Sequence, residues 1–111
     1  MQFTNIPPSI IQPVEEIKLS LKRIYKAKLK NLILFGSYAR GNFEEGSDID
    51  ILLLIENVKN IFDERKKLSY NICDICLKYD VLLSVIPYDF NEYNKLRTPF
   101  ILNVKREGII L

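Results

Sequence analysis

The sequence contains no histidine, and only two of its 111 residues are cysteines. Without histidine, the chain can hold neither a histidine general base nor a histidine-rich metal site. No apolar run approaches the roughly 20 residues of a membrane-spanning helix. The longest run, residues 49–55, is much shorter and contains Asp50. Met1 is followed by polar residues and two prolines, without a basic stretch leading into a long apolar segment, so we expect no signal peptide.

The two cysteines, Cys73 and Cys76, have the C-x-x-C spacing of a redox pair or of half a zinc site. A redox pair normally lies at a helix N-terminus, which activates a thiol, whereas these residues lie deep inside a long helical pattern. Zinc would need further cysteine or histidine ligands. We therefore expect reduced cysteines buried in the core, in agreement with a cytoplasmic location.

The composition is that of a folded protein, with 48% hydrophobic and 27% charged residues. The length predicts a single domain over residues 1–111. The net charge of +2 is too small to indicate a nucleic acid as partner, although it does not exclude one. Basic residues gather over 18–30 and acidic residues over 44–50. A solvated helix face is the favoured interpretation of the basic run, and a basic surface that holds a polyanion beside an acidic pocket is the alternative.

Hydrophobic spacing predicts helices over about 13–28 and 60–78 and strands over 32–35, 49–55 and 81–86, the last ended by Pro87. Asp89 and Glu92 have the capping-box spacing of a short helix. A further helix is predicted over 99–106, closed by Gly108 before a terminal strand over 109–111. This order of elements predicts an α/β or α+β fold in which helices pack on a small sheet.

Two carboxylates, Asp48 and Asp50, flank Ile49 at the start of the second strand. Because side chains alternate along a strand, the two point the same way, about 6.6 Å apart along the backbone. Such a like-charged pair is commonly relieved by a raised pKa or by bound cations, and oxygen donors without histidine favour Mg²⁺ or Mn²⁺. Two such ions would support in-line phosphoryl transfer. The alternative is an aspartate that caps a turn beside an exposed neighbour.

The strand over 32–35 ends in Gly36-Ser37, where the missing Cβ lets backbone amides and the Ser37 hydroxyl approach phosphate oxygens. No Gly-Lys-Ser/Thr follows, so this is not a Walker loop. The strand, the segment from Gly36 to Gly41 and the segment from Gly46 to Asp50 together resemble the signature of the DNA-polymerase-beta-like nucleotidyltransferase superfamily. That signature is a hydrophobic strand, Gly-Ser, a spacer of about ten residues, and Asp-hydrophobic-Asp on the next strand.

The chain length and the Gly-Ser-x-x-Arg-Gly pattern are similar to those of the minimal nucleotidyltransferases, which are often paired with a helical HEPN protein. The resemblance covers about 32–86, and residues 99–108 look like a tail common in some of these proteins. It implies the polymerase-beta-like fold, which is a small mixed sheet with helices packed on it. It also implies that Gly36 and Ser37 contact the triphosphate of ATP and that Arg40 lies near the phosphates. Asp48 and Asp50 would be metal ligands, and Asp80 would be a third carboxylate. Asp74 is a rival for the third carboxylate, and a surface cation is the alternative for Arg40.

From this resemblance we expect an enzyme that depends on Mg²⁺ (or Mn²⁺) and transfers an NMP group to a hydroxyl of a partner protein. The group expected is AMP, taken from ATP. The enzyme would then be an antitoxin-like protein. The chain is too short to supply a further domain for acceptor recognition, so a small helical HEPN-type partner or a second copy of the chain would complete the site. The main alternative is an inactive binding module that neutralises a helical toxin by occlusion. Transfer to a small-molecule antibiotic is a third interpretation.

Overall fold

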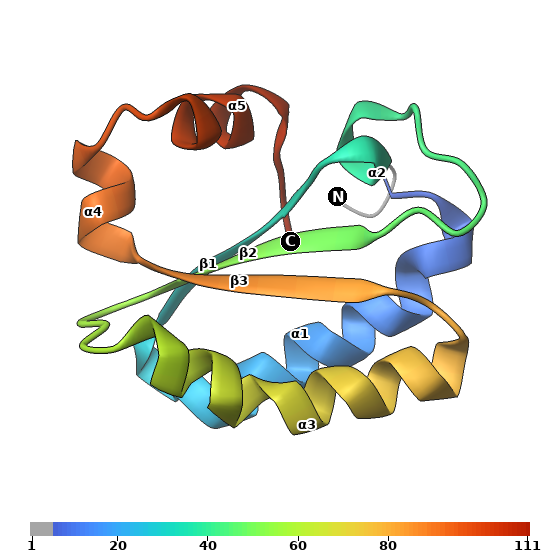
Figure 1. Cartoon of the computed structure of the whole chain (residues 1–111), viewed down its shortest axis with the longest axis horizontal. Coiled ribbons are helices and arrows are strands. Elements are labelled where there is room, and N and C mark those ends of the chain that lie inside the picture. The colour runs from blue at the N-terminus through green and yellow to red at the C-terminus, as the bar shows by residue number, and fades with distance from the viewer. Residues whose placement is uncertain (1–5) are drawn as a thin grey trace.

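A computed structural model of the chain describes residues 6–111 and contains a four-stranded mixed sheet with helices on both faces (Figure 1). The elements in chain order are η2 (Pro8–Ile10), α1 (Ile11–Tyr25), η3 (Lys26–Lys28), β1 (Leu29–Phe35), α2 (Ser37–Arg40), β2 (Ile49–Ile55), α3 (Ile61–Tyr79), β3 (Leu83–Asp89), α4 (Phe90–Lys95), α5 (Pro99–Glu107) and β4 (Ile109–Ile110). This architecture confirms the predicted fold class.

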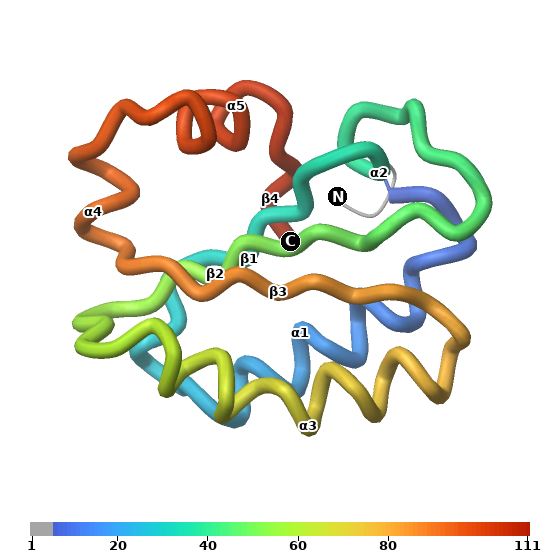
Figure 2. Tube along the Cα trace, viewed as in Figure 1, coloured from blue at the N-terminus to red at the C-terminus, as the bar shows by residue number. Residues whose placement is uncertain are grey.

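The strands lie across the sheet in the order β3-β2-β1-β4. β1 runs antiparallel to both β2 and β4, whereas β2 and β3 are parallel and are connected by α3. Two parallel neighbours need such a crossover connection, and a helix is the usual one. Figure 2 shows the C-terminal end of the chain returning to the sheet beside β1. The register places Asp50 of β2 between Phe35 of β1 and Ser84 of β3.

Successive residues of β2 point to opposite faces of the sheet, and both faces are covered. Ile49, Ile51, Leu53 and Ile55 belong to a buried cluster with residues of α1 and α3. Leu52 and Leu54 belong to a second buried cluster, with residues of α4 and α5. Asp50 shares the alternation of Leu52 and Leu54 and therefore lies on the face that α4 and α5 cover.

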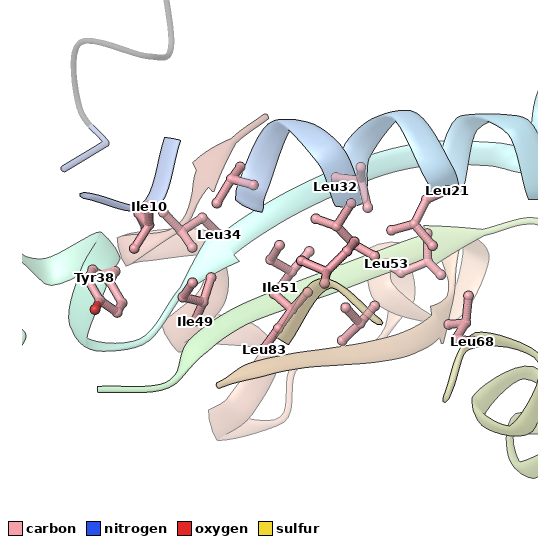
Figure 3. Close-up of a cluster of buried hydrophobic side chains, with 14 of the residues drawn as sticks. Ile10, Leu21, Leu32, Leu34, Tyr38, Ile49, Ile51, Leu53, Leu68 and Leu83 are labelled. Carbon is pink, nitrogen blue, oxygen red and sulfur yellow. The ribbon is translucent and has the colours of Figure 1, made fainter. Parts of the chain in front are cut away.

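The larger cluster forms the main core (Figure 3). Its members include Leu21 of α1, Leu34 of β1, Ile51 of β2 and Leu68 of α3, all fully buried. Full burial of a side chain of this size stabilises a fold by about 1.5–3 kcal/mol relative to exposure. These contacts hold β1 and β2 rigidly, so the polar residues at the ends of both strands are fixed in place.

Side-chain caps begin three of the helices. Asn60 Oδ1 accepts hydrogen bonds from the amides of the first turn of α3, and Thr98 Oγ1 accepts one from the Ile101 amide of α5 at 3.2 Å. Asp89 Oδ2 accepts a hydrogen bond from the Glu92 amide at 3.1 Å, which confirms the predicted cap of α4. Each such cap is worth about 1 kcal/mol. None of the helices within 6–111 is long and apolar enough to cross a membrane.

Two local predictions were wrong. β3 does not end at Pro87 but continues to Asp89, because an edge strand leaves one side of its backbone unpaired and so tolerates proline. Cys73 is exposed and lines an open cavity between α3 and β3, whereas Cys76 is half-buried. The Cys76 Sγ accepts a hydrogen bond from the Leu83 amide at 3.3 Å, so its role is structural.

Candidate active site

The two carboxylates of the Asp-Ile-Asp segment lie at the start of β2. Asp48 precedes the strand and is exposed, whereas Asp50 is the second residue of the strand and is half-buried. Burial raises the pKa of the Asp50 carboxyl above its ordinary value, and the negative charge of Asp48 raises it further. The Arg40 guanidinium opposes this shift. The sheet therefore holds one carboxylate where its charge is unfavourable unless a cation lies nearby.

Gly36 links β1 to α2 and lies directly against Asp50. Its backbone has φ 77° and ψ −157°, a conformation that is essentially restricted to glycine. A Cβ at this position would overlap the Asp50 Oδ2 atom. Glycine is thus required here for two reasons, the backbone conformation and the close approach of the Asp50 carboxylate.

The short helix α2 follows Gly36 and turns the chain over the ends of β1 and β2. The amides of Ala39 and Arg40 both donate to the Gly36 carbonyl, at 3.1 and 3.0 Å. The first amides of a helix have no carbonyl partner within it, so the Ser37 end of this turn presents N–H groups beside Gly36. The fold therefore places Gly36, and Ser37 next to it in the chain, beside Asp50.

Arg40 lies at the other end of α2, close enough to Asp50 to influence its pKa. The Arg40 Nη1 atom donates to Glu107 Oε2 of α5 at 3.3 Å, and this ion pair is partly exposed. The contact with Glu107 was not predicted, because 67 residues separate the two in the chain. Arg40 is therefore held between the carboxylate pair and the C-terminal end of α5.

The loop between α2 and β2 is stabilised by its own hydrogen bonds. The Glu44 amide donates to Ser47 Oγ at 2.8 Å, and the Ser47 amide donates to the Glu44 carbonyl at 3.0 Å. The rings of Tyr38 and Phe43 stack with centroids 4.6 Å apart. These contacts fix the chain that leads into Asp48.

Asp80 ends α3 in a left-handed backbone conformation and is exposed. It lines a cavity of about 350 Å³ together with Ser47, the residue before Asp48. Within 6–111, no group of three or more carboxylate or cysteine side chains lies close enough to hold a metal ion. The structure therefore does not gather Asp80 or Asp74 into one metal-binding group with Asp48 and Asp50.

The position on β3 that directly neighbours Asp50 is held by Ser84. Partners in register project on the same face of a sheet, so Ser84 occupies the place from which β3 could add a ligand. No motif in the sequence singles out Ser84. Only the register of β3, which begins two residues later than predicted, could have identified this position.

A second cavity, of about 210 Å³, has Gly36 in its lining. Its lining residues come from the end of β1, from α2 and from α5: Phe35, Gly36, Arg40, Phe100, Asn103, Val104 and Glu107. The tail segment that contains α5 had no chemistry assigned from the sequence. The structure places this helix beside the candidate site.

The last basic residues of the 18–30 segment lie away from the carboxylate pair. Lys26 and Lys28 line a cavity of about 370 Å³ with Ile55, the last residue of β2. Asp50 lies at the other end of β2. Among these lining residues, Tyr25 donates to Glu64 at 2.7 Å, so the cavity also carries negative charge. The alternative of a basic surface beside the acidic pocket therefore does not hold for this part of the segment.

Comparison with known proteins identifies relatives over nearly the whole chain. Residues 14–111 match the family model described as "Nucleotidyltransferase domain". A protein of Methanocaldococcus jannaschii (strain ATCC 43067 / DSM 2661 / JAL-1 / JCM 10045 / NBRC 100440) with the name "Putative protein adenylyltransferase" is 38% identical over 100 residues, which are 90% of this chain and 96% of the relative.

Solved structures share the fold. A crystal structure of a mutant form of the toxin-antitoxin MntA-HpeT has a TM-score of 0.59 and 25% identity, over 87% of this chain and 70% of that one. A structure described as that of a "putative minimal nucleotidyltransferase" has a TM-score of 0.54 and 24% identity, over 91% and 92% of the two chains.

Proposed function

The chain belongs to the nucleotidyltransferase domain family and is a nucleotidyltransferase, and from this premise we propose that it transfers AMP from ATP to a hydroxyl group of a partner protein. One observation carries the proposal. Asp48 and Asp50 lie at the same end of one strand, close enough for the charge of Asp48 to act on Asp50, and the backbone of Gly36 lies directly against Asp50. A strand end of this kind suits a ligand that brings both cations and phosphates.

The residues at this strand end fit a divalent metal ion. Asp48 and Asp50 offer only carboxylate oxygens, which are the ligands that Mg²⁺ and Mn²⁺ prefer. The pKa of Asp50 is raised by its burial and by Asp48, and a nearby cation would relieve both effects. Mg²⁺ or Mn²⁺ held here would neutralise phosphate charge and favour attack on the α-phosphorus.

In this proposal the triphosphate lies over the turn between β1 and α2. The amides after Gly36 and the Ser37 hydroxyl donate hydrogen bonds to phosphate oxygens. Arg40 extends this set of donors, because its guanidinium already lies between Asp50 and Glu107. A guanidinium suits phosphate because it donates two parallel hydrogen bonds and keeps its charge.

In this proposal the acceptor hydroxyl approaches the α-phosphate through the cavity that Ser47 and Asp80 line. Its oxygen forms a bond to the α-phosphorus, and the bond from that phosphorus to the oxygen that bridges the β-phosphate breaks. Pyrophosphate leaves with the bonding electrons. Asp80 accepts the hydroxyl proton and passes it to solvent, a role that its exposed position allows. Such a transfer depends on positioning and charge stabilisation, so it needs no histidine or nucleophilic cysteine.

The acceptor belongs to a protein that associates with this chain. Similarity to a protein named as an adenylyltransferase and to a toxin-antitoxin structure supports a protein acceptor. We propose a small helical HEPN-type partner, and a second copy of the chain is the alternative. Either would supply an acceptor surface beside the sheet.

Incubation of the chain with a small helical HEPN-type protein, Mg²⁺ and ATP labelled at the α-phosphate tests the proposal. We expect label on the partner with the parent chain and none with the Asp48→Asn, Asp50→Asn double variant. Asp63→Asn removes an exposed carboxylate in the first turn of α3 and serves as the matched control. Circular dichroism verifies that all variants are folded. Transfer by the double variant would refute the proposal.

One observation favours the alternative of a binding module that neutralises a helical toxin by occlusion. The described part of the chain offers two carboxylates at the strand end, with Ser84 and not an acid beside Asp50. A site with fewer carboxylates holds metal less tightly. If the parent chain suppresses the toxicity of its partner and transfers no label, and the double variant suppresses it equally, occlusion is the function.

A further inference from the structure

We propose that α5 forms a subsite for the adenine base, in the cavity between the end of β1 and this helix. The inference rests on the proposed function, because it places the base of the nucleotide whose phosphates bind at Gly36. No part of the sequence motif reaches α5, so the assignment depends on the way the helix packs.

The location of the cavity makes it continuous with the phosphate turn. Gly36 is one of its lining residues and also lies directly against Asp50. A nucleotide with its phosphates at Gly36 and its metal at Asp50 can extend its nucleoside toward α5. The cavity on the Asp80 side remains available to the acceptor.

The size and the walls of the cavity suit a base. Its volume of about 210 Å³ is below the roughly 300–1,000 Å³ of pockets that hold a complete small ligand, so it fits one part of a ligand. The rings of Phe35 and Phe100 meet edge to face, with centroids 5.5 Å apart and planes at 86°. Phe100 is 37% exposed although it is a large apolar residue. An accessible aromatic ring of this kind can stack on a base.

Asn103 supplies the polar group that recognises the base. Its Oδ1 atom accepts a hydrogen bond from Arg106 Nη2 at 2.8 Å, which orients the amide. In the hydrogen bonds found over 6–111, Asn103 Nδ2 has no acceptor, so it can donate to a ligand. Adenine presents an acceptor, N7, beside a donor, the 6-amino group, and this pair matches an asparagine amide. Guanine presents two acceptors on the same edge, so one of them would face the Asn103 oxygen.

Calorimetric titration of the full chain with the Mg²⁺ complexes of ATP, GTP and inorganic tripolyphosphate tests this assignment. Tripolyphosphate measures the phosphate turn alone, and the difference between ATP and tripolyphosphate measures the base subsite. We expect the parent to bind ATP about tenfold more tightly than GTP, as one amide–base pair provides. Asn103→Ala should abolish this preference without changing the affinity for tripolyphosphate.

Two matched controls separate the subsite from general effects on the helices. Asn94→Ala removes an exposed asparagine of α4 outside the cavity and should keep the preference for ATP. Phe100→Ala should weaken ATP and GTP alike by about tenfold, through lost stacking. Leu102→Ala, which removes an exposed side chain of α5 outside the cavity lining, should leave both affinities unchanged.

The outcomes distinguish the two proposals. Equal affinities of the parent for ATP and GTP, or a preference for ATP that survives Asn103→Ala, would overturn the base subsite, and binding of tripolyphosphate would leave the proposed function standing. A parent chain that binds neither nucleotide nor tripolyphosphate would overturn both.

Discussion

Replacement of Gly36 by alanine tests the contact between the phosphate turn and the carboxylate of β2. The new Cβ would overlap the Asp50 Oδ2 atom, and the residue would have to keep φ 77° and ψ −157°. The backbone conformation alone costs about 1–3 kcal/mol for a residue with a side chain. Overlap with a fixed neighbour adds about 1–3 kcal/mol. We therefore expect Gly36→Ala to lower the free energy of unfolding by about 2–6 kcal/mol.

A double-mutant cycle with Asp50→Ala separates these two contributions. Removal of the Asp50 carboxylate removes the overlap but leaves the backbone cost, so Gly36→Ala should cost about 1–3 kcal/mol less in the Asp50→Ala background. Gly41→Ala is the matched control. Gly41 also has a positive φ, 86°, but a Cβ there meets no atom within 4 Å. Its substitution should lower stability by about 1 kcal/mol and show no coupling to Asp50.

Urea denaturation of the metal-free variants, followed by circular dichroism, measures all four corners of each cycle. Equal costs of Gly36→Ala with and without the Asp50 carboxylate would show that Gly36 does not lie against that side chain. The same result would remove the geometric link between the turn and the carboxylate pair on which the proposed site depends.

Four further substitutions have expected outcomes in the same measurement. Asp50→Asn should stabilise the metal-free protein at neutral pH, because burial holds the pKa of Asp50 above its ordinary value. This gain in stability should vanish as the pH falls below that ordinary value. A gain that persists at low pH would contradict a raised pKa of Asp50. Cys76→Ala should lower stability by about 1 kcal/mol, because the hydrogen bond from the Leu83 amide to Cys76 is lost. Cys73→Ala should change stability by less than about 0.5 kcal/mol. Equal effects of the two substitutions would be inconsistent with the different exposure of the two cysteines. Ser84→Asp adds a carboxylate beside Asp50, so it should lower metal-free stability and raise the affinity for Mn²⁺ in a calorimetric titration; unchanged values of both would argue against the register at β3.

Elements with strong periodicity could be predicted from the sequence. The strand expected over 49–55 coincides with β2, since a nearly continuous apolar run indicates burial on both faces. The helix expected over 60–78 is α3, displaced by one residue at each end. Pro87 was misread, because its effect depends on whether the strand lies at the edge of the sheet, and only the strand order shows that. Cys73 was misread, because residues three apart lie only about 60° apart around a helix axis, and their spacing does not show which of them lies nearer the core.

The local part of the candidate site could also be predicted from the sequence. Gly36 and Asp50 come from two neighbouring antiparallel strands, and a short loop motif brings such strand ends together. The contribution of α5 to the site could not be predicted from the sequence. Asn103 and Glu107 reach the end of β1 only because α5 packs across the sheet, and no local pattern encodes that packing. The relation of Ser84 to Asp50 likewise depends on the register of two parallel strands that are separated by α3.

The position of the transferred label tests the proposed reaction most directly. Parallel incubations of the chain, its helical partner and Mg²⁺ with ATP labelled at either the α- or the γ-phosphate show which bond of ATP is broken. We predict that the α-label becomes attached to the partner and that the γ-label leaves as pyrophosphate, both in amounts that depend on Asp48 and Asp50. Attachment of the γ-label, or attachment of neither label by a folded chain that binds its partner, would contradict AMP transfer at this site.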